Sequence, residues 1–197
     1  TATPIPRSLA LAQYGDMDIS IIKQKPPGRK PINTALMSDV RIDEVVDKLK
    51  ESIAKGAQAY WVCPLIEESE VLHYTAAERR FEQLRAKLGE GVVELVHGKM
   101  SSETKDKIMD RFVSGKIKLL VATTVIEVGV NVPSANIMVV ENAEKFGLAQ
   151  LHQLRGRVGR GSNQSTCLLL YKEPLNISSK KRLSILRETE DGFKISE

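Results

Sequence analysis

Lys118-Leu-Leu-Val-Ala122 is a short, nearly continuous apolar stretch that follows an amphipathic segment ending at Gly115. A strand buried on both faces has this composition, because neither face points to water. Runs of the same kind lie at Ala59–Leu65, Val92–Val96, Ile137–Val140 and Thr166–Tyr171. Strands separated by helical stretches of this length are typical of stacked βαβ units, so the chain is predicted to form a mostly parallel sheet.

Amphipathic helices are predicted between these strands, because apolar side chains recur there every three or four positions; they cover residues 41–55, 75–88 and 101–114. Thr75 and Glu78 have the spacing of a capping box, which predicts that the second helix begins at Thr75. Helices on both faces of a parallel sheet define the α/β class, whose ligands bind beyond the carboxyl ends of the strands. The loops that start at His97, Thr123 and Glu141 are therefore candidate functional loops.

The bulk composition sets limits on the class of protein. The 197 residues are 42% hydrophobic, enough for one substantial core, and 29 Lys and Arg against 25 Asp and Glu give a net charge of +4. This balance slightly favours anionic partners and is equally compatible with ordinary solubility. Cys63 and Cys167 stand in apolar runs without metal-ligand spacing, which predicts buried thiols in a reducing cytosol. Because the sequence has no signal peptide and no apolar run of about 20 residues, we expect a soluble protein.

The segment Gln153–Gly161 combines three arginines, Arg155, Arg157 and Arg160, with three glycines. A guanidinium group offers a planar fork of donors that suits phosphate oxygens, and glycine lets a ligand approach the backbone closely. The segment therefore indicates a polyphosphate site. A solvated basic loop is the alternative interpretation.

Three segments resemble motifs III, V and VI of superfamily 2 helicases, in this order: Thr1–Arg7, Leu119–Pro133 and Phe146–Gly161. The resemblance is closer to the RecG branch, the ATP-dependent helicases that remodel stalled forks and Holliday junctions. It covers nearly the whole chain and implies the RecA-like fold of a helicase C-terminal domain. The RecG-like segments are residues 8–11, 26–31, 63–70 and 169–175.

The resemblance also implies a division of the chain into four parts. Residues 1–24 would be the tail of a first motor domain that includes motif III, and 25–36 a basic, proline-rich linker. Residues 37–173 would form the second RecA-like domain, and 174–197 the start of a C-terminal translocation hairpin. The sequence has no Walker A loop and no Asp-Glu motif at a strand end, so the phosphate loop and the magnesium site are expected upstream in a longer protein.

Motif VI of the family implies that Gln153, Arg157 and Arg160 reach across a cleft between two motor domains, with Arg160 at the γ-phosphate of ATP. A trans-acting arginine stabilises the charge that develops on the transferring phosphoryl group. For Arg155 two roles stay open, as a salt-bridge partner or as a further site residue.

Motif V implies contacts of Thr123 and Thr124 with DNA phosphates, and of Gly129 and Asn131 with the nucleotide. Many relatives have Asp at the position of Asn131, which puts that contact with the ribose in question. For the two threonines, capping of a helix entered at Val125 is an alternative role that is compatible with DNA contact.

Two more pairs of residues take roles from the resemblance. His97 and Gly98 are similar to a motif that contacts the nucleic-acid backbone, although a single histidine is more often structural. Thr1 and Thr3 resemble the motif that couples hydrolysis to strand movement.

The resulting hypothesis is the second motor domain of a RecG-like helicase and double-stranded DNA translocase. It implies ATP with Mg²⁺ as cofactors, and branched DNA, the N-terminal RecA-like domain and a wedge domain as partners. We expect a monomer without membrane contact in the bacterial cytosol, associated with the nucleoid. The alternatives are a transcription-repair coupling translocase, which an upstream polymerase-binding domain would indicate, and a non-catalytic nucleic-acid-binding module, which a parent without Walker A would indicate.

Overall fold

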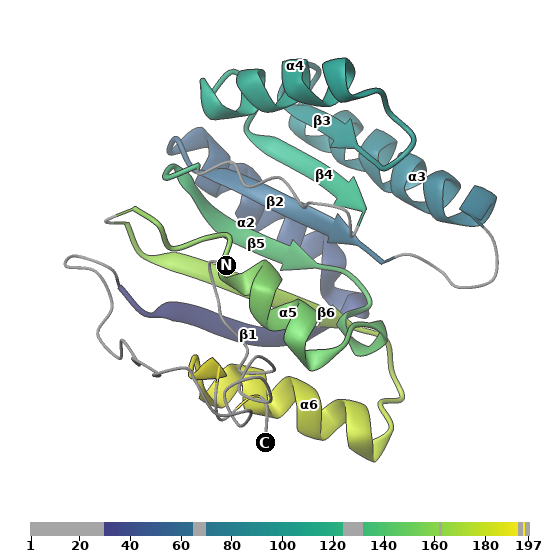
Figure 1. The fold of residues 1–197 in the computed structure, drawn as a ribbon, viewed down its shortest axis with the longest axis vertical. Helices are drawn as coiled ribbons and strands as arrows, with labels where there is room; N and C mark the ends of the chain where they lie inside the picture. The colour runs from purple at the N-terminus through teal and green to yellow at the C-terminus, as the bar shows by residue number, and fades with distance from the viewer. Residues whose placement is uncertain (1–29, 65–69, 124–131, 162, 193–194, 196–197) are drawn as a thin grey trace, which may run out of the picture.

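The computed structural model describes residues 30–64, 70–123, 132–161, 163–192 and 195. Within these ranges the strands form one parallel sheet in the order β1-β6-β5-β2-β4-β3 (Figure 1). The strands are β1 (Ile32–Ser38), β2 (Gln58–Cys63), β3 (Val93–Val96), β4 (Leu119–Thr123), β5 (Ala135–Val140) and β6 (Ser165–Tyr171). The helices are α2 (Ile42–Ala54), α3 (Glu70–Leu88), α4 (Ser102–Val113), α5 (Leu148–Arg155) and α6 (Ile177–Glu188), with 3-10 turns η2 (Asp39–Arg41) and η3 (Ala143–Lys145).

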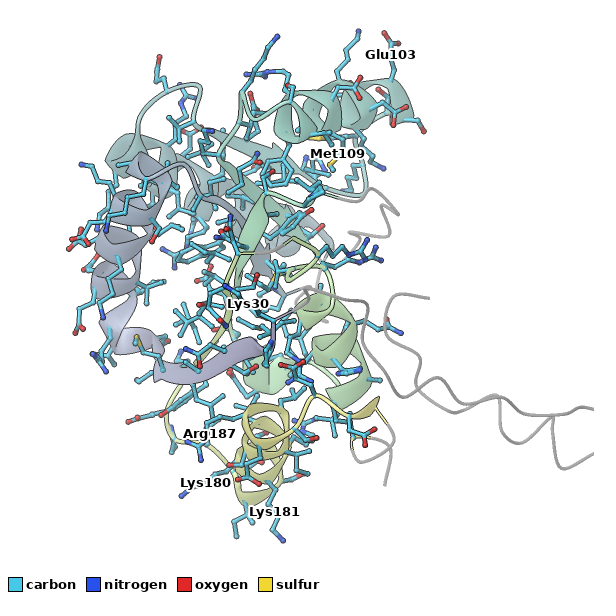
Figure 2. All side chains as sticks on the ribbon, turned by 90° about the vertical axis from the view of Figure 1, so that its left-hand side faces the viewer. Lys30, Glu103, Met109, Lys180, Lys181 and Arg187 are labelled. Carbon is cyan, nitrogen blue, oxygen red and sulfur yellow. The ribbon has the colours of Figure 1, made fainter. Side chains whose placement is uncertain are left out.

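Helices cover both faces of this sheet, as the apolar strand runs predicted. In β2 the side chains of Ala59 and Trp61 belong to the core under α2 and α3, whereas Tyr60 and Val62 belong to the core under α4, α5 and α6. The view in Figure 2 shows α2 and α5 on opposite sides of the sheet. The α/β fold class is therefore confirmed, and the burial of apolar side chains on both faces stabilises it.

Local capping explains the ends of some helices and not of others. The Ser101 side chain accepts a hydrogen bond of 3.2 Å from the Thr104 backbone and so caps α4. The second predicted helix, however, begins at Glu70 and not at Thr75. The prediction of its start was wrong, because the residues before Thr75 have no helix-breaking side chain and the helix continues through the capping-box sequence.

The folded domain is longer at both its N-terminal and its C-terminal side than the predicted range 37–173. Residues 32–36, expected in the linker, belong to β1, which pairs with β6 from Ile32 opposite Ser165 to Ser38 opposite Tyr171. Because β1 is a half-buried edge strand, it lacks the continuous apolar run of the central strands. At the other end, Leu183 and Leu186 of α6 are 1% exposed and join the core. The basic helix beyond residue 173 is therefore part of this core.

Several predictions lie outside the described residues. They include motif III with Thr1 and Thr3, and the part of motif V from 124 to 131. Among the described helices, none is long and apolar enough to span a membrane.

Candidate nucleotide and nucleic-acid sites

The described site residues on loops and strand ends lie at two opposite edges of the sheet. Because all described strand pairs are parallel, the carboxyl ends of the strands form one edge and the amino ends form the other. His97 follows β3 and Thr123 ends β4, which places both at the carboxyl edge. The loop from Gly156 to Gly161 leads toward the start of β6 and contacts the amino edge (Figure 1). Among the described residues, His97 and Thr123 thus lie at the carboxyl ends, where parallel sheets bind ligands, and the motif VI loop does not.

Two glycines fix the motif VI loop against the amino edge. Gly159 has φ +75°, a conformation that L side chains rarely adopt, and a Cβ atom there would lie 3.0 Å from Cγ1 of Ile32. A Cβ atom on Gly161 would lie 2.6 Å from the carbonyl oxygen of Pro133. The loop therefore packs on the start of β1 and on the turn before β5, so these two glycines serve close packing within the chain.

The loop carries Arg157 and Arg160, and both act electrostatically on Tyr60 of β2. Both side chains are half-buried, and Arg160 Nε donates a weak hydrogen bond of 3.4 Å to the Gly156 carbonyl. Burial raises the pKa of Tyr60 to about 12, and the positive charges of Arg160 and Arg157 partly oppose this shift. Both guanidinium groups thus lie within electrostatic reach of this buried phenol. Gln153, the third predicted member, is exposed on α5.

Arg155 lies inside the core, where it bonds to α6. Its side chain is 2% exposed, and its guanidinium donates to the carbonyl of Leu186 at 2.5 Å and contacts His152 Nδ1 at 2.9 Å. A longer contact of 3.5 Å reaches Thr34 Oγ1. Burial lowers the pKa of Arg155. Arg155 therefore ties α5 to α6 from inside the core and is unavailable to a ligand.

The periodicity of α5 contained a signal for this burial that the sequence analysis missed. Arg155 lies one turn after the buried Leu151 and next to the buried Leu154, so it occupies the inward face. His152 shares this face. Burial, and then the charge of Arg155, lower the pKa of His152 to about 4. The imidazole is neutral at pH 7, and Nδ1 accepts from Arg155 because a guanidinium has no acceptor.

At the carboxyl edge the structure places the predicted DNA residues in different environments. Gly98 is exposed and its carbonyl accepts from Lys105 Nζ at 3.1 Å, whereas His97 is half-buried and burial lowers its pKa. Thr123 is 1% exposed, and its Oγ1 has no hydrogen-bond partner among the described residues. Thr124 lies outside the described residues.

Motif V connects the two edges. Thr123 stands at the carboxyl edge, and Val132, the next described residue, stands just before the amino end of β5, where its carbonyl accepts from Ala135 at 3.0 Å. Gly129 and Asn131, the predicted nucleotide residues of this motif, lie in the undescribed part between them.

Glu141, in the third candidate loop, belongs to a polar cluster that the sequence analysis did not foresee. Its carboxylate accepts from Arg80 Nε at 2.9 Å, from Arg80 Nη2 at 2.6 Å and from Trp61 Nε1 at 2.7 Å. The Cys63 thiol also contacts it at 3.6 Å. These contacts join β2, α3 and β5, so Glu141 has a structural role here.

The two cysteines are buried and unpaired with each other, as predicted. Burial raises the pKa of Cys167 to about 12 and that of Cys63 well above its usual value. Both are therefore protonated and inert at neutral pH. In the described parts of the chain, no three His, Cys, Asp or Glu side chains gather where they could hold a metal ion.

Comparison with known proteins agrees with the motifs. RecG of Escherichia coli K12, an ATP-dependent DNA helicase, is 53% identical over all of this chain, and RecG of Haemophilus influenzae is 54% identical. In both cases the chain spans 29% of the relative's length. A structure of RecG bound to a three-way DNA junction matches 98% of the chain, and 25% of that protein, with a TM-score of 0.82 and 45% identity.

More distant similarity supports the fold alone. The L327V variant of Saccharomyces cerevisiae Dbp5, bound to RNA and ADP-BeF3, matches 95% of the chain and 47% of that protein with a TM-score of 0.62 and 15% identity. These matches confirm the RecA-like fold expected from the motifs. The protein family "Helicase conserved C-terminal domain" matches residues 41–162, which is more than half of the sequence. This chain therefore belongs to the family of helicase conserved C-terminal domains.

Proposed function

We propose that this chain is the second motor domain of an ATP-dependent DNA helicase that remodels stalled forks and Holliday junctions in recombination and repair. The observation that carries the proposal is the loop at the amino edge, where Gly159 and Gly161 pack closely on the chain and Arg157 and Arg160 both act electrostatically on Tyr60. The similarity to RecG over the whole chain supports the choice of DNA as substrate.

At the amino edge, Arg160 is the residue proposed to meet the γ-phosphate of ATP when two motor domains close. Arg157 and Gln153 would contact the same nucleotide, and Gly129 and Asn131 of motif V are proposed as further nucleotide-binding residues. Such an arginine accelerates phosphoryl transfer by about 10³ to 10⁵ because it stabilises charge that grows in the transition state. The phosphate loop and Mg²⁺ are assigned to the upstream domain.

At the carboxyl edge, His97, Gly98, Thr123 and Thr124 are proposed to contact a DNA strand through its phosphates. The exposed backbone at Gly98 is open to such a contact. Because the Thr123 side chain is buried, its contribution would come from its backbone. A base-independent contact of this type positions the strand without reading its sequence.

The remaining proposals concern the parent protein. Residues 1–24, with Thr1 and Thr3, would couple hydrolysis to strand movement at the end of the first motor domain, and α6 would begin the translocation hairpin. The partners would be that first RecA-like domain and a wedge domain in the same monomer, acting in the bacterial cytosol near the nucleoid.

The test is Arg160→Ala in the full-length protein. We expect DNA-stimulated ATP turnover to fall by orders of magnitude, while the affinity for forked DNA stays within a few-fold, because the loss falls on the transition state. Arg160→Lys should restore little, since a point charge cannot reproduce the planar fork. Arg79→Ala, an exposed arginine of α3, is the matched control. Near-normal turnover in Arg160→Ala, or an equally large loss of DNA affinity, would contradict the proposal.

A second test uses the 197-residue chain by itself. It should fold, because its parallel sheet has helices on both faces, and it should hydrolyse no ATP, because it has no Walker A loop. DNA-stimulated ATP hydrolysis by the purified chain would refute the proposal that this chain supplies only one of the two motor domains that hydrolysis needs.

A further inference from the structure

We propose that Gly161 is a positioning residue for Arg160. Its missing side chain lets the motif VI loop close on the carbonyl oxygen of Pro133, and this contact sets where the neighbouring Arg160 stands relative to the turn at Pro133. The inference rests on the function proposed above for Arg160. It adds Gly161 as a residue that positions Arg160 for this function.

The requirement for glycine at this position is steric. A Cβ atom on Gly161 would lie 2.6 Å from the Pro133 oxygen and 3.5 Å from the Pro133 carbonyl carbon, and real Cβ contacts under 3.0 Å essentially never occur. The neighbour is backbone, which cannot rotate away as the end of a side chain can. Gly161 does not have a positive φ, so an alanine could adopt its backbone conformation. Space alone demands glycine here.

The contacts around Pro133 decide which partner would move. Ser134, the next residue, donates from Oγ to the side-chain oxygen of Gln58. The Gln58 amide, 1% exposed, donates in turn to the carbonyls of Phe112 at 2.6 Å and Ile117 at 2.8 Å. The turn at Pro133 is thereby anchored to the end of α4 and to the segment before β4. A methyl group on Gly161 would therefore displace the motif VI loop, and Arg160 is the adjacent residue.

Other glycines of this region provide contrast and control. Gly159 meets only side-chain atoms within 3.4 Å, but its φ of +75° strains any replacement. Gly147, which precedes α5, has φ −68° and no atom within 4 Å of a Cβ position. Gly147→Ala is thus the same chemical change in the same motif without the clash.

The experiment is a double-mutant cycle in the full-length protein, read by DNA-stimulated ATP turnover. For Gly161→Ala we expect kcat to fall about 10- to 100-fold, since misplacement by about 1 Å costs this much. The KM for ATP and the affinity for forked DNA should change less. Gly147→Ala should match the wild type. Because Gly161 acts through Arg160, Gly161→Ala should cause no further fall when Arg160→Ala is already present.

The outcomes separate the two proposals. Normal turnover in Arg160→Ala would reject the proposed function itself. With Arg160→Ala impaired, a Gly161→Ala enzyme of normal kcat, or one whose loss multiplies with that of Arg160→Ala, would overturn the positioning role. A collapse of the melting temperature in Gly161→Ala would overturn it as well, because Gly161 would then determine folding.

Discussion

Arg155 in α5 donates a hydrogen bond of 2.5 Å to the carbonyl oxygen of Leu186 in α6. The bond joins the helix that precedes the motif VI loop to the C-terminal helix of the described core. Because the guanidinium also contacts His152, one buried cation organises the packing of α5 and α6.

Arg155→Ala should lower the free energy of unfolding by about 3–5 kcal/mol, because it leaves a cavity and an unpaired carbonyl in the core. Urea unfolding of the chain at pH 7.5 measures this loss. Arg155→Lys should recover little, since one ammonium group cannot reach both partners. The exposed Arg79→Ala should change stability by less than about 0.5 kcal/mol. A loss below about 1 kcal/mol in Arg155→Ala would contradict the structural role.

Stability should fall in mild acid because of His152. Its pKa is about 4 in the folded chain against 6.5 for the free side chain, so the unfolded state binds the proton first. The contribution of the neutral His152 is complete above pH 6.5 and is lost as the pH falls toward 4, by up to roughly 3 kcal/mol. Unfolding at a series of pH values, compared between the wild type and His152→Gln, isolates this residue from His97. Parallel curves for the two proteins would show that His152 does not titrate as inferred.

Glu141→Leu should destabilise the chain by about 2–4 kcal/mol, because Arg80 and the Trp61 indole lose their common acceptor in a half-buried site. The matched control is Glu103→Gln, which removes the exposed helical pair with Lys107 and should cost less than about 0.5 kcal/mol. Thermal or urea unfolding distinguishes the two. Equal losses would mean that the cluster is no stronger than a surface ion pair.

Thr124→Ala in the full-length protein should weaken DNA binding by a few-fold, equally for duplexes of different base sequence, because hydroxyl contacts to phosphates carry no base information. Thr123→Val should weaken it less, since the Thr123 hydroxyl is buried. Affinities must be compared at one salt concentration, because binding to a polyanion depends steeply on ionic strength. A base-dependent loss, or a larger effect at Thr123, would argue against this arrangement.

The central strands and the family could be predicted from the sequence because their signals are local. A strand buried on both faces needs a continuous apolar run, and Lys118–Ala122 has one; the ordered motifs V and VI then identify the helicase family. The same locality explains one failure. A capping box at Thr75 reports a preference of four residues, and the helix that begins at Glu70 overrides it.

Tertiary structure decided the edges of the domain, the role of Arg155 and the division of the site. Ile32–Ser38 became a strand because β6, more than 120 residues later, offers a parallel partner. Arg155 resembles its neighbours Arg157 and Arg160 in sequence, but only the packing of α6 against α5 encloses it and supplies the Leu186 carbonyl. The sequence determined which residue types could bind phosphate and which could fill a core. Which arginines remain accessible, and at which edge of the sheet, depends on contacts between distant segments, which no local pattern contains.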